Sequence, residues 1–148
     1  MQSQVVIPDD VVKSVAPLLN MDLNTSYLVL GQHLSQMENP AYAMTAVPQV
    51  QASFGARISL PKVDLAAKAK DFLKAYWPSI LKESCDWWGK NKDQYTGASQ
   101  ISALAAVIAP VIPAPWGLIA TVLAIIAVIL IRAGLNALCQ NLPSSPPS

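Results

Sequence analysis

Apolar residues recur at helical spacing along most of this chain, so the pattern predicts helices rather than strands. The clearest stretch is 62–93, where apolar and aromatic side chains fall on one face and lysines on the other. The apolar face holds Leu65, Ala69, Phe72, Leu73 and Tyr76, then Ile80, Leu81, Ser84, Trp87 and Trp88. Pro78 lies between the two groups, so we expect two amphipathic helices with a break at this proline.

Residues 1–61 predict shorter helices. Asp9 or Asp10 is suited to begin a first helix that ends near Pro17. Asn24 or Thr25 is suited to begin a second one that runs to about Met37. Several prolines follow, and 40–61 is expected to be broken helix or loop.

The C-terminal third has a different pattern. There is no charged residue from Gln94 to Ile131, and most positions are apolar. Three prolines between Pro110 and Pro115 must interrupt any helix there. We therefore expect a hydrophobic helical hairpin over 97–139, with a short first helix at about 98–109 and a long second helix at 116–135.

The two helices of this hairpin differ in the expected free energy of insertion and in length. Leu118 to Ile131 contains ten Leu, Ile or Val residues. At roughly −0.5 kcal/mol each, they favour insertion into a bilayer by about 5 kcal/mol. A helix over 116–135 would be about 30 Å long, which is one hydrocarbon thickness. The short first helix cannot span alone, so 116–135 is the predicted membrane helix.

Small residues recur along both helices of the hairpin at spacings of three and four. This pattern lets helix backbones approach closely in lipid, and it predicts a helix-packing seam. The seam consists of Gly117, Ala120, Ala124 and Ala127 in the second helix and of Ala98, Ser102, Ala105 and Ala109 in the first. The two stripes are expected to meet each other or copies in a homo-oligomer. The alternative is that alanine is simply common in apolar helices.

Aromatic and basic residues flank the hairpin, as is typical of a membrane interface. The expected interface residues are Trp77, Trp87, Trp88, Trp116, Lys82, Lys90, Lys92 and Arg132. More lysines precede the hairpin than follow it, which predicts a membrane protein whose N-terminal domain faces the cytoplasm. The N-terminus lacks the pattern of a signal peptide. An ordinary helix pair packed into a protein core is the alternative for 62–93, and 140–148 is expected to be a disordered Pro/Ser tail.

The composition limits the classes of function that fit this chain. With 53% hydrophobic and 13% charged residues and a net charge of +1, the chain resembles membrane-associated proteins and lacks the basic excess of a nucleic-acid binder. The single histidine, His33, and the scattered glycines predict no catalytic site, no metal site and no cofactor. Cys85 and Cys139 are far apart in sequence and are expected to be free thiols.

These patterns predict an all-α protein: a small helical domain, an amphipathic helix pair and a C-terminal hydrophobic hairpin. The expected function is to perturb or permeabilise an anionic bilayer as an oligomer, as toxins and cell-suicide effectors do. The layout of 97–139 attached to amphipathic helices resembles that of colicin-type pore domains. Two alternatives stay open. One is a tail-anchored adaptor or small subunit of a membrane-protein complex, and the other is a soluble interaction protein that buries the hairpin as its core.

Overall fold

The computed structural model describes residues 7–38, 62–91, 94–113 and 119–147. These residues form α-helices and short 3-10 helices and contain no strand, which confirms the all-α prediction for this part of the chain. The elements are α1 (Asp9–Val15), η1 (Ala16–Asn20), α2 (Leu23–Glu38), α5 (Lys62–Asn91), α6 (Gly97–Ile108), η2 (Ala109–Val111), α7 (Ala120–Ala133) and α8 (Leu135–Asn141).

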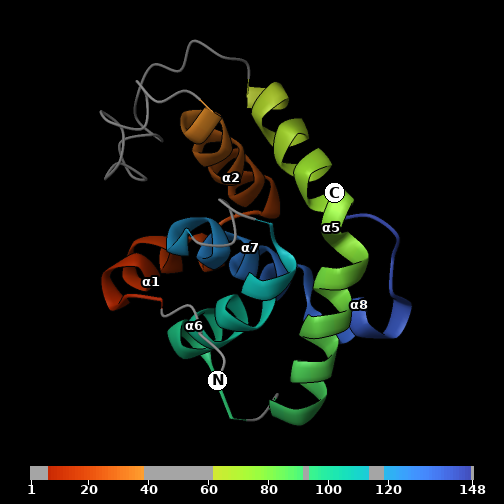
Figure 1. Ribbon diagram of the computed structural model, residues 1–148. Coiled ribbons are helices and arrows are strands. Elements are labelled where there is room, and N and C mark those ends of the chain that lie inside the picture. Colours follow the sequence, from red (N-terminus) through yellow and green to blue (C-terminus); the bar gives the residue numbers. More distant parts are fainter. Residues whose placement is uncertain (1–6, 39–61, 92–93, 114–118, 148) are drawn as a thin grey trace.

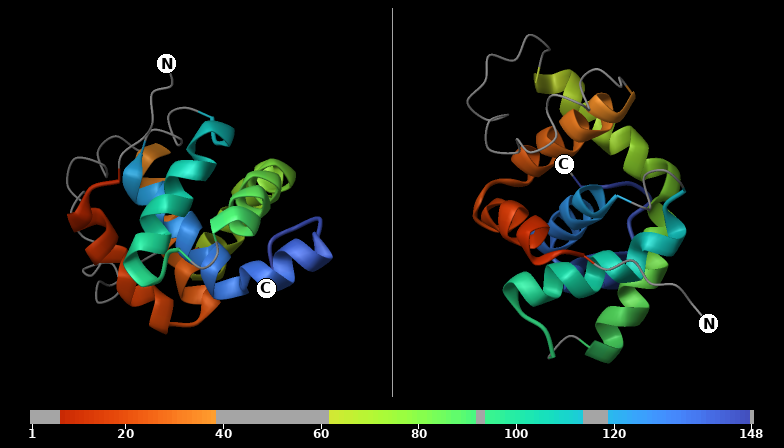
Figure 2. Two further views of the ribbon diagram at one scale, coloured as in Figure 1. Left: turned by 90° about the horizontal axis from the view of Figure 1, so that it is seen from below. Right: turned by 60° about the vertical axis from the view of Figure 1, so that its left-hand side comes forward.

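The helices are arranged around α7. It contacts α1, α2, α6 and α8, and both views of Figure 2 show it enclosed by the other helices. The long helix α5 lies on the outside, where it packs along α2 and also contacts α6 and α8 (Figure 1). The most apolar of the described helices is therefore the centre of the bundle.

The first two helices begin close to where the sequence predicts. α1 begins at Asp9 and buries Val12 and Val15, but its N-terminal cap is Pro8, so Asp9 and Asp10 lie in the first turn and not at the cap. α2 begins earlier than the prediction, because Asp22 is its N-terminal cap and accepts a hydrogen bond from the backbone N–H of Thr25 at 3.2 Å. A carboxylate at this position satisfies a free N–H and also interacts favourably with the helix dipole. The expected loop at 40–61 lies outside the described residues.

The break predicted at Pro78 is wrong, since α5 is one continuous helix of 30 residues. Pro78 is exposed on its outer face, where water can reach the carbonyl group of Lys74 that a proline leaves without a helical donor. Burial follows the predicted face: Leu65, Ala69, Leu73, Ile80 and Leu81 all lie in the core. The amphipathic pattern therefore predicted the structure of α5 better than the position of the proline did.

The hairpin forms, but its second helix is shorter than expected. α6 matches the predicted 98–109 closely and begins with a capping box between Thr96 and Ser99. α7 has 14 residues, or about 21 Å, whereas the predicted helix over 116–135 has about 30 Å. Gly134 ends it with φ 96°, a conformation that favours glycine, and α8 then leaves at 79° to α7.

The C-terminal segment is described as far as Pro147. α8 extends to Asn141, and the following residues lie beside α5 before they reach α2 (Figure 1). There the Tyr27 hydroxyl donates a hydrogen bond to the carbonyl oxygen of Pro147. The Tyr27 side chain is fully buried, so its hydroxyl needs such an acceptor. This contact joins the end of the described segment to α2.

Candidate functional site

The candidate site is the α6–α7 hairpin, and its central feature is the complete burial of the middle nine residues of α7. All nine residues from Val122 to Leu130 have an exposed fraction of 0%. An ordinary amphipathic helix buries one face and exposes the other, whereas these nine residues cover every face of the helix. The middle of α7 is therefore apolar on all sides and is covered on all sides.

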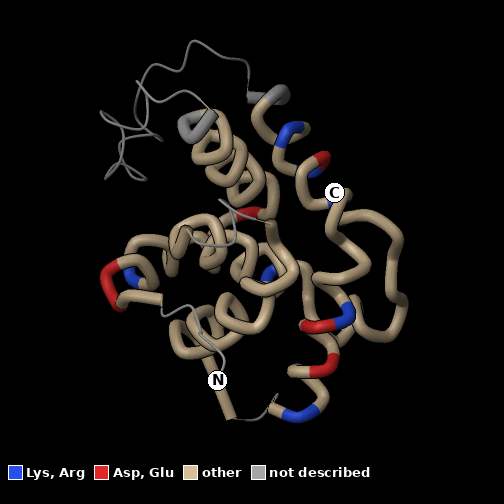
Figure 3. Tube along the Cα trace, viewed as in Figure 1, with Lys and Arg blue, Asp and Glu red and all other residues tan. Residues whose placement is uncertain are grey.

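The cover of α7 is the apolar core that the other helices form around it, and α1, η1, α2, α6 and α8 contact α7 directly. This core includes Val12, Val15 and Leu18 from α1 and η1, Tyr27, Leu30 and Leu34 from α2, and Leu73, Trp77 and Ile80 from α5. Charged residues lie on the outer side of this cover, mainly along α5, and α6 has none (Figure 3). The bundle thus separates an apolar hairpin from a charged outer helix.

The helices differ in their ability to cross a bilayer. Among the described residues, no single helix is both long and apolar enough to do so. The bent pair of α7 and α8 meets the requirement of a span when the two are taken together, by length and composition alone. The predicted membrane helix over 116–135 thus corresponds mainly to α7, and the bent pair extends beyond it to the end of α8.

The predicted packing seam lies only partly in the core. Ala124 and Ala127 of α7 and Ala105 and Ala109 of α6 are buried, and the two helices contact each other. Ala120 and Ser102 are half-buried and Ala98 is exposed, while Gly117 lies outside the described residues. The seam between the helices thus stays a prediction.

A closer helix approach, which the sequence analysis missed, joins α2 to α5. A Cβ atom added to Gly31 would come within 2.0 Å of the backbone oxygen of Leu65. Only glycine permits this separation of the two backbones. Gly31 lies within an apolar run of α2, and a glycine inside a helix was the available signal.

The predicted interface residues are separated by the fold. Trp77 is fully buried in the core. Trp87 and Trp88 are half-buried, and the ring of Trp87 lies 5.5 Å from that of Tyr95. Lys82 and Lys90 are exposed on the same part of α5. This end of α5 therefore presents aromatic and basic side chains together, without Trp77.

The remaining predicted interface residues lie elsewhere. Arg132 at the end of α7 is exposed, and its Nε donates a hydrogen bond to the backbone oxygen of Met21 at 2.8 Å. It connects α7 to the turn before α2. Trp116 and Lys92 lie outside the described residues.

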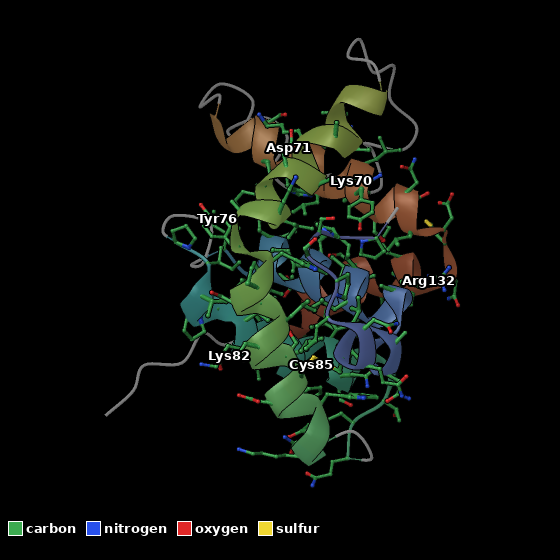
Figure 4. All side chains as sticks on the ribbon, turned by 90° about the vertical axis from the view of Figure 1, so that its right-hand side faces the viewer. Lys70, Asp71, Tyr76, Lys82, Cys85 and Arg132 are labelled. Atoms are coloured by element: carbon green, nitrogen blue, oxygen red, sulfur yellow. A yellow bond between two sulfur atoms is a disulfide. The ribbon has the colours of Figure 1, made fainter. Side chains whose placement is uncertain are left out.

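The expectation of two free thiols is wrong, because Cys85 of α5 and Cys139 of α8 form a disulfide. Their Cα atoms are 5.5 Å apart although 54 positions separate them in the sequence. Distance along the chain carried no information here, since α8 returns to pack beside α5. Figure 4 shows Cys85 on the part of α5 that faces α8, and Lys82 pointing outward. The bond also leaves no Cys85 thiol to act as a nucleophile.

A second contact reinforces the junction of α5 and α8. Trp88 Nε1 donates a hydrogen bond to Asn136 Oδ1 at 2.8 Å. Beside it, an open groove of about 480 Å³ lies between α5 and the C-terminal segment, and both cysteines line it. Both cysteines are half-buried at this groove.

Three titratable groups of the α2 region have shifted pKa values. Burial raises the pKa of Tyr27 to about 12, and Lys70 Nζ lies 5.0 Å from the centre of its ring. Burial lowers the pKa of His33. Hydrogen bonds from Thr25 lower the pKa of Asp22. The neutral forms of Tyr27 and His33 are thus the ones that fit the bundle.

Comparisons with protein-family models, with curated proteins and with solved structures find no match for this chain.

Proposed function

We propose that this protein inserts its α6–α7 hairpin into an anionic bilayer and permeabilises it as an oligomer. The observation that carries the proposal is the complete burial of Val122 to Leu130 inside the other helices. In this proposal the bundle is the form that exists before insertion, and the outer helices keep the hairpin from water.

A helix that is apolar on all sides suits two environments, the core of a protein and the interior of a membrane. Seven of the nine residues from Val122 to Leu130 are Val, Leu or Ile. At roughly −0.5 kcal/mol each, they favour transfer of the opened helix into lipid by about 3.5 kcal/mol. α6 has no charged side chain, and Arg132 in the last turn of α7 is the one charge of the two helices that opposes this transfer.

Unpaired polar atoms in the core and exposed lysines on α5 both favour opening of the bundle. Within the described residues, Ser26 Oγ, Trp77 Nε1 and Ser84 Oγ are buried without a hydrogen-bond partner. A buried polar group in this state costs about 1–3 kcal/mol, which weakens the hold of α2 and α5 on the core. The exposed lysines of α5 would meet anionic lipid first. As in the sequence-based prediction, we propose that the N-terminal helices stay on the cytoplasmic side.

The same burial supports a second candidate, a soluble helical interaction protein whose core is the hairpin. Such a protein would bind partners through its outer helices and would never expose α7. A tail-anchored adaptor is the third candidate, in which the α7–α8 pair holds the chain in the membrane. Membrane binding and membrane damage distinguish all three.

The test uses the purified full chain with phosphatidylcholine vesicles that contain or lack phosphatidylglycerol. Flotation reports binding and release of a trapped dye reports permeabilisation, each measured with the disulfide intact and after its reduction. Flotation with dye release from the anionic vesicles is the expected result. Flotation without release would favour the anchor. A chain that does neither in both thiol states would contradict membrane insertion and favour the soluble protein.

A further inference from the structure

The junction between α7 and α8 is a single glycine with room to move. Gly134 has φ 96°, and a Cβ atom added there would meet nothing within 4 Å. Its N–H already bonds to the backbone oxygens of Leu130 and Ile131, as in a continuing helix. A change in the backbone dihedral angles at Gly134 would therefore be enough to align α8 with α7.

Alignment would produce a helix of the length that α7 lacks. The 14 residues of α7, Gly134 and the 7 residues of α8 would form one helix of 22 residues. At 1.5 Å per residue it would be about 33 Å long, which exceeds the hydrocarbon thickness of about 30 Å. The bend at Gly134 thus separates a helix of spanning length from one that is too short. Arg132 would lie near the middle of the aligned helix, and its charge is the main cost of insertion.

Three contacts hold α8 in the bent position. Leu135 and Leu138 are buried in the bundle core. Asn136 accepts the hydrogen bond from Trp88. The disulfide between Cys139 and Cys85 is the strongest, because it is covalent and lies near the far end of α8 from the hinge.

We propose that the Cys85–Cys139 disulfide is a redox clasp: it keeps α8 on α5, and its reduction frees α8 to align with α7 and complete a membrane-spanning helix. This inference rests on the proposed function for its consequence in the membrane. It concerns regulation of the same hairpin, because the clasp decides when a full span is available.

The reaction is thiol–disulfide exchange with a dithiol reductant. One thiolate of the dithiol attacks a sulfur of the Cys85–Cys139 bond, which breaks and gives a mixed disulfide and one free cysteine. The second thiol of the reductant then displaces the other cysteine. The protein gains two electrons and two protons, and the dithiol becomes a disulfide. Both cysteines line the open groove beside α5, so the reductant can reach them.

Such a clasp responds to the redox state of its surroundings. A disulfide persists in oxidising compartments and is reduced by the dithiol systems of the cytosol. The bundle would stay closed in the first setting and would open in the second. Because insertion would require reduction, it would occur only at membranes that face a reducing compartment.

The test compares three forms of the full chain: oxidised, reduced with dithiothreitol and capped with iodoacetamide, and reduced and then bridged between the two sulfurs with a short dihaloalkane. The bridged form is the matched control, since it has been reduced but keeps the covalent link. Hydrogen exchange of the backbone amides is measured in solution, and flotation is measured with vesicles that contain phosphatidylglycerol. The Cys85→Ser/Cys139→Ser variant, which needs no capping reagent, is measured alongside.

We expect the amides of Leu135–Asn141 to exchange at least tenfold faster in the capped form and in the serine variant, with α2 and α6 still protected. The bridged form should match the oxidised form. The capped form should also float at a tenfold lower lipid concentration than the oxidised form. Unchanged exchange in α8, or loss of protection in all helices at once, would overturn the clasp. Faster exchange in α8 without flotation would support the clasp and would contradict the proposed membrane function instead.

Discussion

Gly31 of α2 and Leu65 of α5 bring the two helix backbones so close that a single Cβ atom on Gly31 would lie 2.0 Å from the Leu65 carbonyl oxygen. α2 and α5 are two of the helices that cover the hairpin, and this is where they meet most tightly. The contact is made by backbone atoms, so no side-chain adjustment can relieve an added methyl group.

Gly31→Ala should therefore force α2 and α5 apart. We expect a loss of about 3 kcal/mol in the free energy of unfolding, the upper end of what overpacking costs, because the neighbouring atoms belong to a helix backbone. Urea denaturation followed by circular dichroism measures this loss.

Gly89→Ala is the matched control for that variant. Gly89 also lies in a helix, but an added Cβ would meet nothing within 4 Å. There the better helix propensity of alanine should stabilise the protein by up to about 1 kcal/mol. Equal midpoints for Gly31→Ala and the unmodified chain would show that the close approach does not exist.

A charge on α6 should separate membrane insertion from folding. Ala106 is only half-buried in the bundle, so Ala106→Lys should leave the fold intact. Inside a bilayer the same lysine costs about 3 kcal/mol, which predicts roughly 100-fold weaker insertion. Flotation and dye release with anionic vesicles measure the effect.

Ala75→Lys adds the same charge at an exposed position of α5, the helix that carries most of the lysines. Binding by this control should be unchanged or slightly stronger, because the added charge faces anionic lipid. If both variants bind and release dye equally, α6 does not enter the membrane.

Reduction should cost stability even without a membrane. The disulfide closes a loop across 54 positions, and the chain-entropy model assigns such a bond about 4 kcal/mol. We expect the Cys85→Ser/Cys139→Ser variant to lose free energy of unfolding of this order. A loss below about 1 kcal/mol would mean that α8 is held by its other contacts, and the clasp would then have little to release.

Acid should weaken the bundle through His33. Burial lowers its pKa in the folded state, so below the ordinary value of about 6.5 the unfolded chain binds the proton more readily. The stabilising contribution is complete above that pH and is lost as the pH falls through the folded pKa. Asp22, whose pKa is lowered from 3.8, contributes only in a more acidic range.

His33→Gln tests this contribution, because glutamine keeps a polar side chain and does not titrate. Urea midpoints measured between pH 7.5 and pH 5 should fall with pH for the unmodified chain and stay nearly constant for the variant. Parallel pH profiles for the two proteins would assign the acid sensitivity to other groups.

The sequence predicted the helices better than their connections. The spacing of apolar residues in the sequence was enough to predict the inner face of α5 and the whole of α6, because this spacing decides which side of a helix is apolar. The continuity of α5 through Pro78 depends on exposure of that residue to water, which spacing does not report. The point at which α7 ends and α8 begins depends on the backbone angle at Gly134, which glycine permits but does not require.

The candidate site was recognisable only in outline. The uncharged run from Gln94 to Ile131 located the hairpin, but its cover by other helices is a tertiary property. The disulfide and the Gly31 contact join residues from different helices, and one sequence gives no information on such pairs. Trp77 shows the same limit, since an aromatic residue on an amphipathic helix suits both an interface and a core, and the fold placed it in the core.

Hydrogen exchange of the reduced full chain on phosphatidylglycerol vesicles tests most directly whether the bundle opens to release its hairpin. We expect α1 and α2 to lose protection when the chain binds, while α6 and α7 keep theirs because lipid replaces the protein cover. Bound protein that retains the protection of every helix would contradict opening, and the hairpin would then be the permanent core of the fold.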